Sequence, residues 1–219
     1  QNPQLRTSSL QRRDQAIANY REVEKALVKV RDAYRPMMKD LLDIEKVQSG
    51  RMVFEMQPTE LRAVVTAAVS ANRSLTASNA ARLTMPRALD PGFVSADPDR
   101  LGQVLANLLS NAVKFSPPGS CVEIGVERVE ERMRVSVRDH GPGIPDEFHS
   151  RIFQRFAQAD GSSTRSKGGT GLGLSISRAI VERLGGTIGF SPAPGGGTVF
   201  FFDLPYLAAD ASASIVGVS

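Results

Sequence analysis

Apolar residues recur every three or four positions near the start of the chain, which predicts one long helix over residues 12–48. They fall at Ala16, Tyr20, Val23, Leu27, Val30, Tyr34, Met37, Leu41 and Ile44. Alternating steps of four and three form a heptad seam, and so narrow a seam suits another helix better than a sheet. We therefore predict a dimer through residues 12–48. A single amphipathic helix docked on its own domain is the alternative. Pro36 should kink this helix or remove one backbone hydrogen bond.

The rest of the chain predicts an α+β domain with helices on one face of a mainly antiparallel sheet. Valine-rich alternation over 121–129 and 132–139 predicts two paired strands joined at Glu130-Glu131. Further strands are expected at 52–56, 82–85, 93–96, 187–191 and 197–204. Helices are expected from Thr59, a plausible N-cap, to about Asn79, over 98–115 and over 171–184.

Small and polar segments mark the boundaries of these elements. Ser49-Gly50 should end the first helix as a flexible joint. This divides the chain into a dimerisation region at 1–50, a second domain at 51–206 and a disordered tail at 207–219. Residues 158–170 are rich in Ser, Gly, Thr and charge, so they are expected to form a mobile loop.

Composition restricts the partners and the compartment. A chain of 219 residues with 41% hydrophobic content can build one medium domain and an extra helix. The net charge of +4 is spread along the chain, so no nucleic-acid partner is implied. Cys121 is the only cysteine, which excludes an internal disulfide and fits a reducing compartment. No apolar run approaches a membrane span and no signal peptide is visible. We expect a cytoplasmic location, although a longer protein could be tethered to a membrane.

The predicted helix 98–115 carries a polar stripe. Gln103, Asn107, Asn111 and Lys114 are spaced by four, four and three residues, so they share one face of an otherwise apolar helix. Asparagine oxygens are hard ligands suited to Mg²⁺, and Lys114 would add positive charge for phosphates. An exposed polar face explains the helix alone equally well.

Asp139 ends a strongly apolar strand and precedes Gly141, Gly143 and Ile144. A carboxylate there can accept a hydrogen bond from an adenine amino group, and glycine lets the backbone approach the purine closely. On its own, however, Asp-x-Gly-x-Gly is a common turn pattern.

The glycine-rich run Gly168–Gly173 leads directly into a predicted helix. Backbone N–H groups at such an N-terminus favour anions. Arg165 and Lys167 in the preceding loop could reach terminal phosphates, or they could be ordinary solvated charges. Phe153 and Phe156 precede this loop, either as core aromatics or as a hinge that couples the loop to another surface.

Taken together, these motifs resemble the ATP-binding half of bacterial two-component sensor histidine kinases. The wider GHKL family includes gyrase, heat-shock chaperone ATPases and mismatch-repair ATPases. The matches are Asn107–Phe115 to the N box, Asp139–Ile144 to the G1 box, Phe153–Phe156 to the F box, Gly169–Leu174 to the G2 box and Gly195–Thr198 to the closing glycine-threonine element. Asp40–Met52 resembles the end of the second dimerisation helix and its junction with the catalytic domain.

The resemblance implies a two-layer α/β sandwich of the Bergerat type that binds ATP and Mg²⁺ under a mobile lid. Metal ligation is implied for Asn107 and Asn111. ATP contacts are implied for Asn107, Asn111, Lys114, Asp139, Gly141, Gly143, Ile144, Phe156, Arg165, Lys167, Gly169, Thr170, Gly171, Leu172, Gly173, Leu174 and Thr198.

The chain departs from the family at the phosphate-accepting histidine. The nearest match to the family's acceptor motif is Pro3–Ser8, with Pro3 where the family has histidine. Neither His140 nor His149 lies in such a motif. The resemblance therefore implies a histidine kinase domain that transfers the γ-phosphate of ATP to a histidine missing from this chain. Its expected partner is a response regulator or a histidine-bearing domain. A nucleotide-binding pseudokinase that regulates a partner is the alternative. The long first helix argues against a serine kinase of the anti-sigma type.

Overall fold

The computed structural model describes residues 3–72, 80–85, 92–158 and 170–208. Two compact units make up the chain, Gln1–Asp43 and Ile44–Ser219. The first unit consists of most of helix α1 (Pro3–Gln48), which begins earlier than the predicted residue 12. Proline is favoured as a first helical residue, because its missing N–H would have had no partner there. The helix continues through Pro36.

Most of the seam predicted on α1 is exposed, although Met37 and Ile44 are half-buried and Ile44 packs against the core. Tyr20, Leu27 and Tyr34 are 70%, 64% and 57% exposed, and Val23, Val30 and Leu41 are exposed as well. Among the helices that the structure describes, none is both long and apolar enough to span a bilayer.

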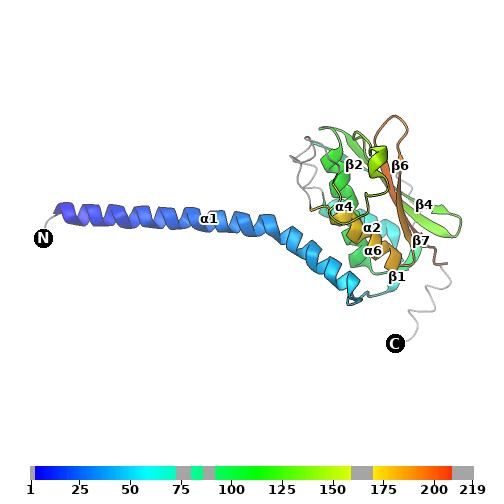
Figure 1. The fold of residues 1–219 in the computed structure, drawn as a ribbon, viewed down its shortest axis with the longest axis horizontal. Helices are drawn as coiled ribbons and strands as arrows, with labels where there is room; N and C mark the ends of the chain where they lie inside the picture. Colours follow the sequence, from blue (N-terminus) through cyan, green and yellow to red (C-terminus); the bar gives the residue numbers. More distant parts are fainter. Residues whose placement is uncertain (1–2, 73–79, 86–91, 159–169, 209–219) are drawn as a thin grey trace. The chain divides into compact units, whose positions relative to one another are not determined.

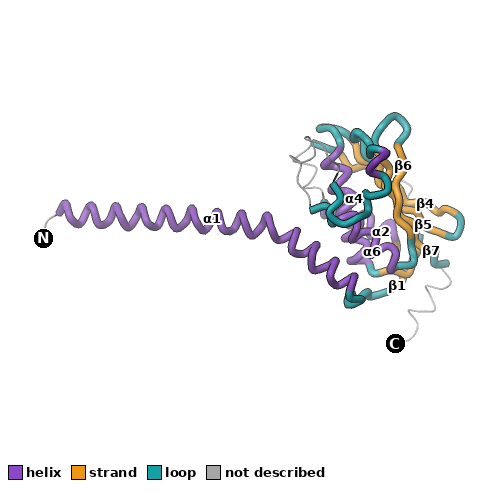
Figure 2. The backbone as a smooth tube through the Cα atoms, in the orientation of Figure 1, coloured by secondary structure: helices purple, strands orange, loops and turns teal. Residues whose placement is uncertain are grey.

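The second unit is built on a five-stranded sheet with the order β2-β4-β5-β7-β6 (Figures 1 and 2). The strands are β2 (Arg82–Thr84), β4 (Cys121–Val129), β5 (Arg132–Arg138), β6 (Thr187–Pro192) and β7 (Thr198–Pro205). Only the β2–β4 pair is parallel. A separate antiparallel pair joins β1 (Gln57–Glu60) to β3 (Phe93–Ala96).

Helices cover one face of this sheet, so the predicted two-layer α+β sandwich is confirmed (Figure 1). They are α2 (Leu61–Ala71), α4 (Pro98–Phe115) and α6 (Gly173–Arg183). In β5, alternate residues point toward the helices, because Met133, Val135 and Val137 are buried. Arg134, Ser136 and Arg138 face the other side, which follows from the two-residue period of a strand.

The opposite face of the sheet is covered by side chains of the sheet itself. Arg134 makes a two-pronged ion pair with Asp203, at 2.7 and 2.8 Å, and stacks on Phe201 with its guanidinium carbon 4.2 Å from the ring centroid. A Cβ at Gly189 would lie 2.9 Å from the Phe201 ring. Glycine at this position therefore lets the aromatic ring lie flat on the neighbouring strand.

Two predictions near the start of this unit are wrong. Residues 52–56 form no strand, because the neighbouring strand β1 begins only at Gln57. Thr59 is not an N-cap: it belongs to β1, opposite Val94, and its hydroxyl donates to the Ala96 carbonyl at 3.1 Å. Helix α2 follows at Leu61 and ends at Ala71, before the predicted Asn79. Residues 73–79 lie outside the described part of the chain.

Candidate nucleotide site

Helix α4 supplies the polar stripe that the sequence predicts. It begins at Pro98 with Asp97 as N-cap, and Ser116, which is followed by two prolines, is its C-cap. Its apolar positions are fully or almost fully buried: Leu101, Val104, Leu105, Leu108, Leu109, Ala112 and Val113. Asn107, Asn111 and Lys114 remain half-buried on this helix. Because the apolar face is held against the rest of the domain, the stripe has a fixed orientation.

Asn107 is fixed by helix α6. Its side-chain Nδ2 donates a hydrogen bond of 2.8 Å to the Oγ of Ser177, which is buried. A Cβ at Gly173 would lie 2.2 Å from the Asn107 Oδ1. Glycine at 173 is therefore required for the amide to fit between α4 and α6, and the bond to Ser177 holds the amide in place between the two helices.

Ser177 was missed by the sequence reading. It lies on the helix that starts at Gly173, one turn further along, so both residues face the same way. The only sequence signal for Ser177 is that a small polar residue lies next to Ile176 and near Ile180, which are buried. This signal does not indicate which residue Ser177 contacts.

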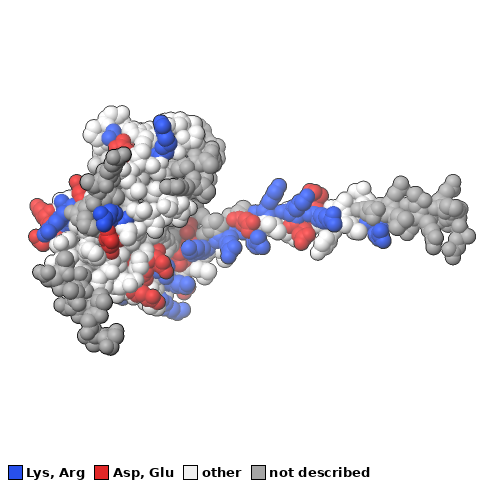
Figure 3. Space-filling view, turned by 180° about the vertical axis from the view of Figure 1, so that it is seen from behind, with Lys and Arg blue, Asp and Glu red and all other residues white. Residues whose placement is uncertain are grey.

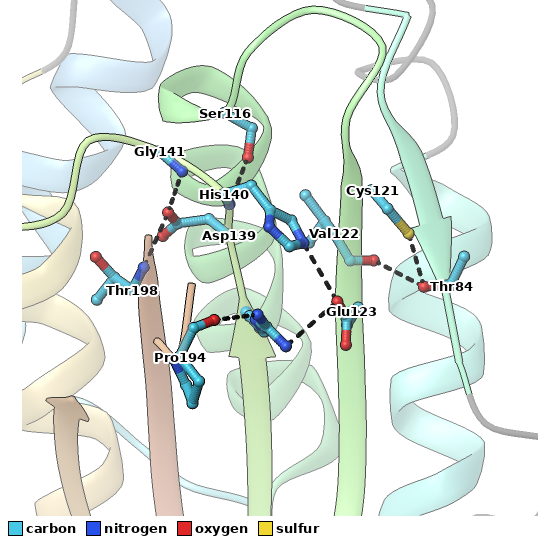
Figure 4. A network of polar contacts seen from close by, with 11 residues as sticks. Thr84, Ser116, Cys121, Val122, Glu123, Asp139, His140, Gly141, Pro194 and Thr198 are labelled. Carbon is cyan, nitrogen blue, oxygen red and sulfur yellow. Dashed lines mark hydrogen bonds and ion pairs between the residues drawn. The ribbon is translucent and has the colours of Figure 1, made fainter. Parts of the chain in front are cut away.

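Asp139 lies at the end of β5 and is only 4% exposed. Its Oδ1 accepts hydrogen bonds from the Gly141 N–H at 2.8 Å and the Thr198 N–H at 3.2 Å (Figure 4). Burial raises the pKa of this carboxyl group above its ordinary value, because a desolvated charge is disfavoured, and the two backbone bonds act in the opposite direction. The structure thus brings together Asp139, Gly141 and Thr198, which come from two separate motifs.

Close backbone contacts hold this turn in place. A Cβ at Gly197 would lie 2.1 Å from the Asp139 carbonyl oxygen, and the φ of Gly197 is +93°. A Cβ at Gly141 would lie 3.0 Å from the Phe115 carbonyl oxygen at the end of α4. The Ser116 Oγ accepts from the His140 N–H at 3.3 Å. The end of α4, the Asp139 turn and the start of β7 are therefore packed backbone against backbone. Gly143, with φ +81°, and the half-buried Ile144 follow in this turn.

The described part of the glycine-rich run packs on the protein. The Thr170 Oγ1 accepts from the Leu172 N–H at 3.2 Å, and Leu172 is fully buried. A Cβ at Gly171, whose φ is +69°, would lie 2.9 Å from the backbone carbon of Phe156. Phe156 itself is 65% exposed with a φ of +57°. Leu174 packs partly buried against the core. Arg165, Lys167 and Gly169 lie outside the described residues.

Both histidines are engaged by other groups. The His140 Nε2 lies 3.2 Å from Glu123 on the sheet face away from the helices (Figure 4), and Glu123 also pairs with Arg138 at 3.7 Å. The His149 Nε2 lies 3.0 Å from the Ile144 carbonyl oxygen, and its ring meets Phe190 edge-on at 4.9 Å. Each histidine thus has one ring nitrogen held by another part of the domain.

The donor set fits magnesium bound through amide oxygens. Within the described ranges no group of three or more His, Cys, Asp or Glu side chains could hold a metal ion. Asn107 and Asn111 lie one turn apart on α4, and Mg²⁺ accepts such oxygens when waters and phosphates supply the remaining ligands. Figure 3 shows acidic and basic side chains interspersed on the face in view, with no extended area of one sign.

Comparison with known proteins identifies the family of this domain. Residues 96–208 match the family model described as histidine kinase-, DNA gyrase B- and HSP90-like ATPase. The chain is 37% identical over 174 residues to the signal transduction histidine-protein kinase BarA of Escherichia coli K12, covering 77% of this chain and 19% of that protein. It is 37% identical over 217 residues to the sensor histidine kinase AruS of Pseudomonas aeruginosa, covering 95% of this chain and 21% of that protein. The chain thus spans about a fifth of the length of these relatives.

Solved structures give the same result. Full-length ShkA in complex with AMPPNP matches with a TM-score of 0.76 and 26% identity, over 86% of this chain and 39% of that one. The histidine kinase AdeS of Acinetobacter baumannii matches with a TM-score of 0.69 and 25% identity, over 94% and 98%. The match to the family model covers the turn at Asp139, the stripe on α4 and the run that opens α6. The chain therefore belongs to the family of histidine kinase-, DNA gyrase B- and HSP90-like ATPases.

Proposed function

We propose that this chain binds Mg-ATP and presents the γ-phosphate to a histidine other than His140 and His149. The observation that carries the proposal is the buried Asp139 carboxylate, whose Oδ1 is held by two backbone N–H groups. Its Oδ2 is the acceptor for the adenine amino group. A charge buried at this cost is retained where a ligand uses it, which is typical of binding sites.

The phosphates are expected at the other end of the site, against the stripe on α4. Magnesium, when bound, would neutralise phosphate charge. Asn107 and Asn111 would hold it, with the Asn107 amide oriented by Ser177. Lys114 supplies a fixed positive charge on the same helix. Thr170, Gly171 and Gly173 position the start of α6, where backbone N–H groups favour the phosphates.

Transfer then depends mainly on positioning. An imidazole nitrogen of the acceptor attacks the γ-phosphorus as the bond to the β–γ bridging oxygen breaks and ADP leaves. A neighbouring base must take the imidazole proton. The His140 Nε2 is paired with Glu123 and the His149 Nε2 with the Ile144 carbonyl, and neither histidine lies in a sequence like the family's acceptor motif. We therefore expect the acceptor to be supplied by another segment or another molecule.

Helix α1 is proposed as the dimer interface. The exposed residues Tyr20, Leu27, Tyr34 and Leu41 repeat at heptad spacing, and solvent exposure of such a seam is costly without a partner. The curated relatives are named as sensor and signal-transduction kinases. By analogy we propose a response regulator as the downstream partner and the cytoplasm as the site of action.

Titration of ATP by calorimetry tests the pocket. Asp139→Asn should weaken ATP binding at least about 100-fold, because the buried acceptor is lost and a donor faces the adenine amino group. Asp146→Asn is the matched control, because the Asp146 side chain is fully exposed at the start of the short helix Asp146–Phe148. Unchanged affinity in Asp139→Asn would overturn the assignment of this pocket.

The metal ligands are tested by repeating the titration with and without magnesium. Asn111→Ala should remove most of the magnesium-dependent gain in affinity and leave the magnesium-free affinity within about threefold. An equal loss under both conditions would show that Asn111 contacts the nucleotide or maintains the fold instead.

The missing acceptor is tested with labelled ATP. The chain alone should form no acid-labile phosphohistidine, whereas a supplied histidine-bearing helix should become labelled. Label on this chain that disappears in His149→Ala would contradict the first expectation. ATP binding without transfer to any supplied helix would favour a regulatory pseudokinase over a kinase.

A further inference from the structure

The segment at residues 51–56, here called the linker, joins the end of α1 to strand β1. Its side chains alternate like those of a strand. Met52 is 5% exposed and Phe54 packs partly buried on the core, whereas Val53 between them is 75% exposed. The alternation ends at Met56, which is 48% exposed. The linker nevertheless has no strand partner, so something other than a ladder holds its backbone.

One end of the linker is bound to the last turn of α1. The N–H groups of Arg51 and Met52 both donate to the Lys46 carbonyl oxygen, at 2.9 and 3.0 Å. Gly50, with φ +64°, makes the left-handed turn that allows this. The linker therefore follows the position of the C-terminal turn of α1.

The other end of the linker is bound to Asp97, the N-cap of α4. The Oδ1 of Asp97 accepts from the Asp99 and Arg100 N–H groups, at 3.0 and 3.1 Å, which is ordinary helix capping. Its Oδ2 accepts from the Glu55 N–H at 3.0 Å, across 42 positions of sequence. Asp97 is only 6% exposed. One buried carboxylate thus binds the linker and the first turn of α4 at the same time.

We infer that Asp97 is a positioning residue that fixes the linker to helix α4 and so connects the end of α1 to the helix that bears Asn107 and Asn111. Bonds from N–H groups to a carboxylate are stronger than bonds between neutral groups, and burial strengthens them further. Because α4 is a rigid element with a buried apolar face, a shift at its first turn moves the whole polar stripe. The expected effect on the nucleotide site rests on the proposed function. The hydrogen bond from the Glu55 N–H to the Asp97 Oδ2, here called the anchor, does not.

Two substitutions separate the anchor from the cap. Asp97→Asn keeps an Oδ1 that can cap α4, and asparagine is as good an N-cap as aspartate. It replaces Oδ2 with an NH₂ group, which cannot accept from Glu55. Asp97→Ala removes both functions. Asp99→Asn is the control, because Asp99 is an exposed acid in the same turn of the helix.

Hydrogen exchange of individual amides, measured by NMR on the whole chain without nucleotide, tests the anchor. In Asp97→Asn the Glu55 amide should exchange at least about 10-fold faster, while the Asp99 and Arg100 amides change less than about threefold. In Asp97→Ala all three should accelerate, and in Asp99→Asn the Glu55 amide should not change. A Glu55 amide that exchanges at the wild-type rate in Asp97→Asn would overturn the inference and leave Asp97 as a helix cap alone.

The same measurement with saturating ADP tests the connection to the nucleotide site. Coupling between two sites is reciprocal, so ADP should slow exchange at Glu55 by about threefold or more in the wild type. In Asp97→Asn this ADP effect should vanish, although calorimetry should still show ADP binding. An ADP effect of wild-type size in Asp97→Asn, or none in the wild type with ADP bound, would overturn the positioning role. If wild-type calorimetry shows no ADP binding, the proposed function fails, and the exchange rates without nucleotide still decide on the anchor.

Discussion

Helices α1 and α4 use the same kind of apolar residue in opposite ways. In α4, Leu105 and Leu108 are fully buried beneath the polar stripe. In α1, Leu27 and Tyr20 are 64% and 70% exposed, although their heptad spacing is as regular as any in the chain. The difference teaches that α4 completes its packing within one chain, whereas Leu27 and Tyr20 of α1 would be buried only in the proposed dimer.

The consequence for stability is also opposite. Most helices in proteins are stabilised by packing of an apolar face rather than by intrinsic propensity. Helix α4 obtains that packing in its own unit, so its formation is independent of concentration. We expect the helicity of α1, in contrast, to increase with protein concentration. Three experiments can break or sharpen this contrast.

The largest effect is expected from charges on the seam. Leu27→Glu combined with Leu41→Glu would remove four leucines from a dimer interface, each worth about 1.5–3 kcal/mol when buried. Sedimentation at micromolar concentration should show a monomer, and circular dichroism should show lost helix. Lys29→Glu, at an exposed charged position, is the control. A wild-type chain that sediments as a monomer would contradict the proposed interface.

A smaller effect is expected from the matched truncations Leu108→Ala and Leu27→Ala. Leu108→Ala leaves a cavity in the core and should lower the free energy of unfolding of the second unit by about 2–5 kcal/mol. Leu27→Ala should change that transition by less than about 0.5 kcal/mol, because its side chain is exposed in α1. Calorimetric unfolding measures both. A large loss in Leu27→Ala would show that α1 packs on the domain.

The smallest effect is expected from removing the charge of Asp139, which is buried in the nucleotide site. The pKa of Asp139 is raised by burial, so the folded chain binds more protons than the unfolded chain as the pH rises above 3.8. Stability is therefore lost as the pH rises through the window between the unfolded and folded pKa values, and at pH 7 the ionised group is a cost. Asp139→Asn should raise the Tm of the nucleotide-free chain by about 2–4 °C at pH 7.

The pH dependence provides the check. The gain in Asp139→Asn should shrink as the pH is lowered toward 3.8, because a growing share of the wild-type carboxyl groups is then protonated. Asp146→Asn, at a fully exposed side chain, should show no such trend. A lower Tm in Asp139→Asn at pH 7 would mean that the hydrogen bonds from Gly141 and Thr198 outweigh the cost of burial.

The sequence correctly predicted the elements whose ends are set by neighbouring residues in the chain. Helix α4 has its N-cap Asp97, followed by a proline, at one end and two prolines after Ser116 at the other, and the predicted range 98–115 is confirmed. Strands β4 and β5 were predicted to within a residue, because their alternation is strict and their turn short.

The errors occur where a distant partner decides the outcome. The alternation of Met52 and Phe54 is real, but the Glu55 N–H bonds to the side chain of Asp97 instead of a strand. The sequence around Thr59 is typical of an N-cap, but in the structure Thr59 belongs to a strand and pairs with Val94. The bond from Asn107 to Ser177 joins two helices, so no local pattern could reveal it.

The contact between Gly197 and the Asp139 carbonyl oxygen affects how a mutational scan of this chain should be interpreted. Any side chain at 197 would collide with the backbone of the turn, and the residue also adopts a φ that favours glycine. Gly197 should therefore tolerate substitution as poorly as Asp139 does, without touching the ligand. Intolerance in such a scan identifies the residues that shape the pocket together with those that bind in it.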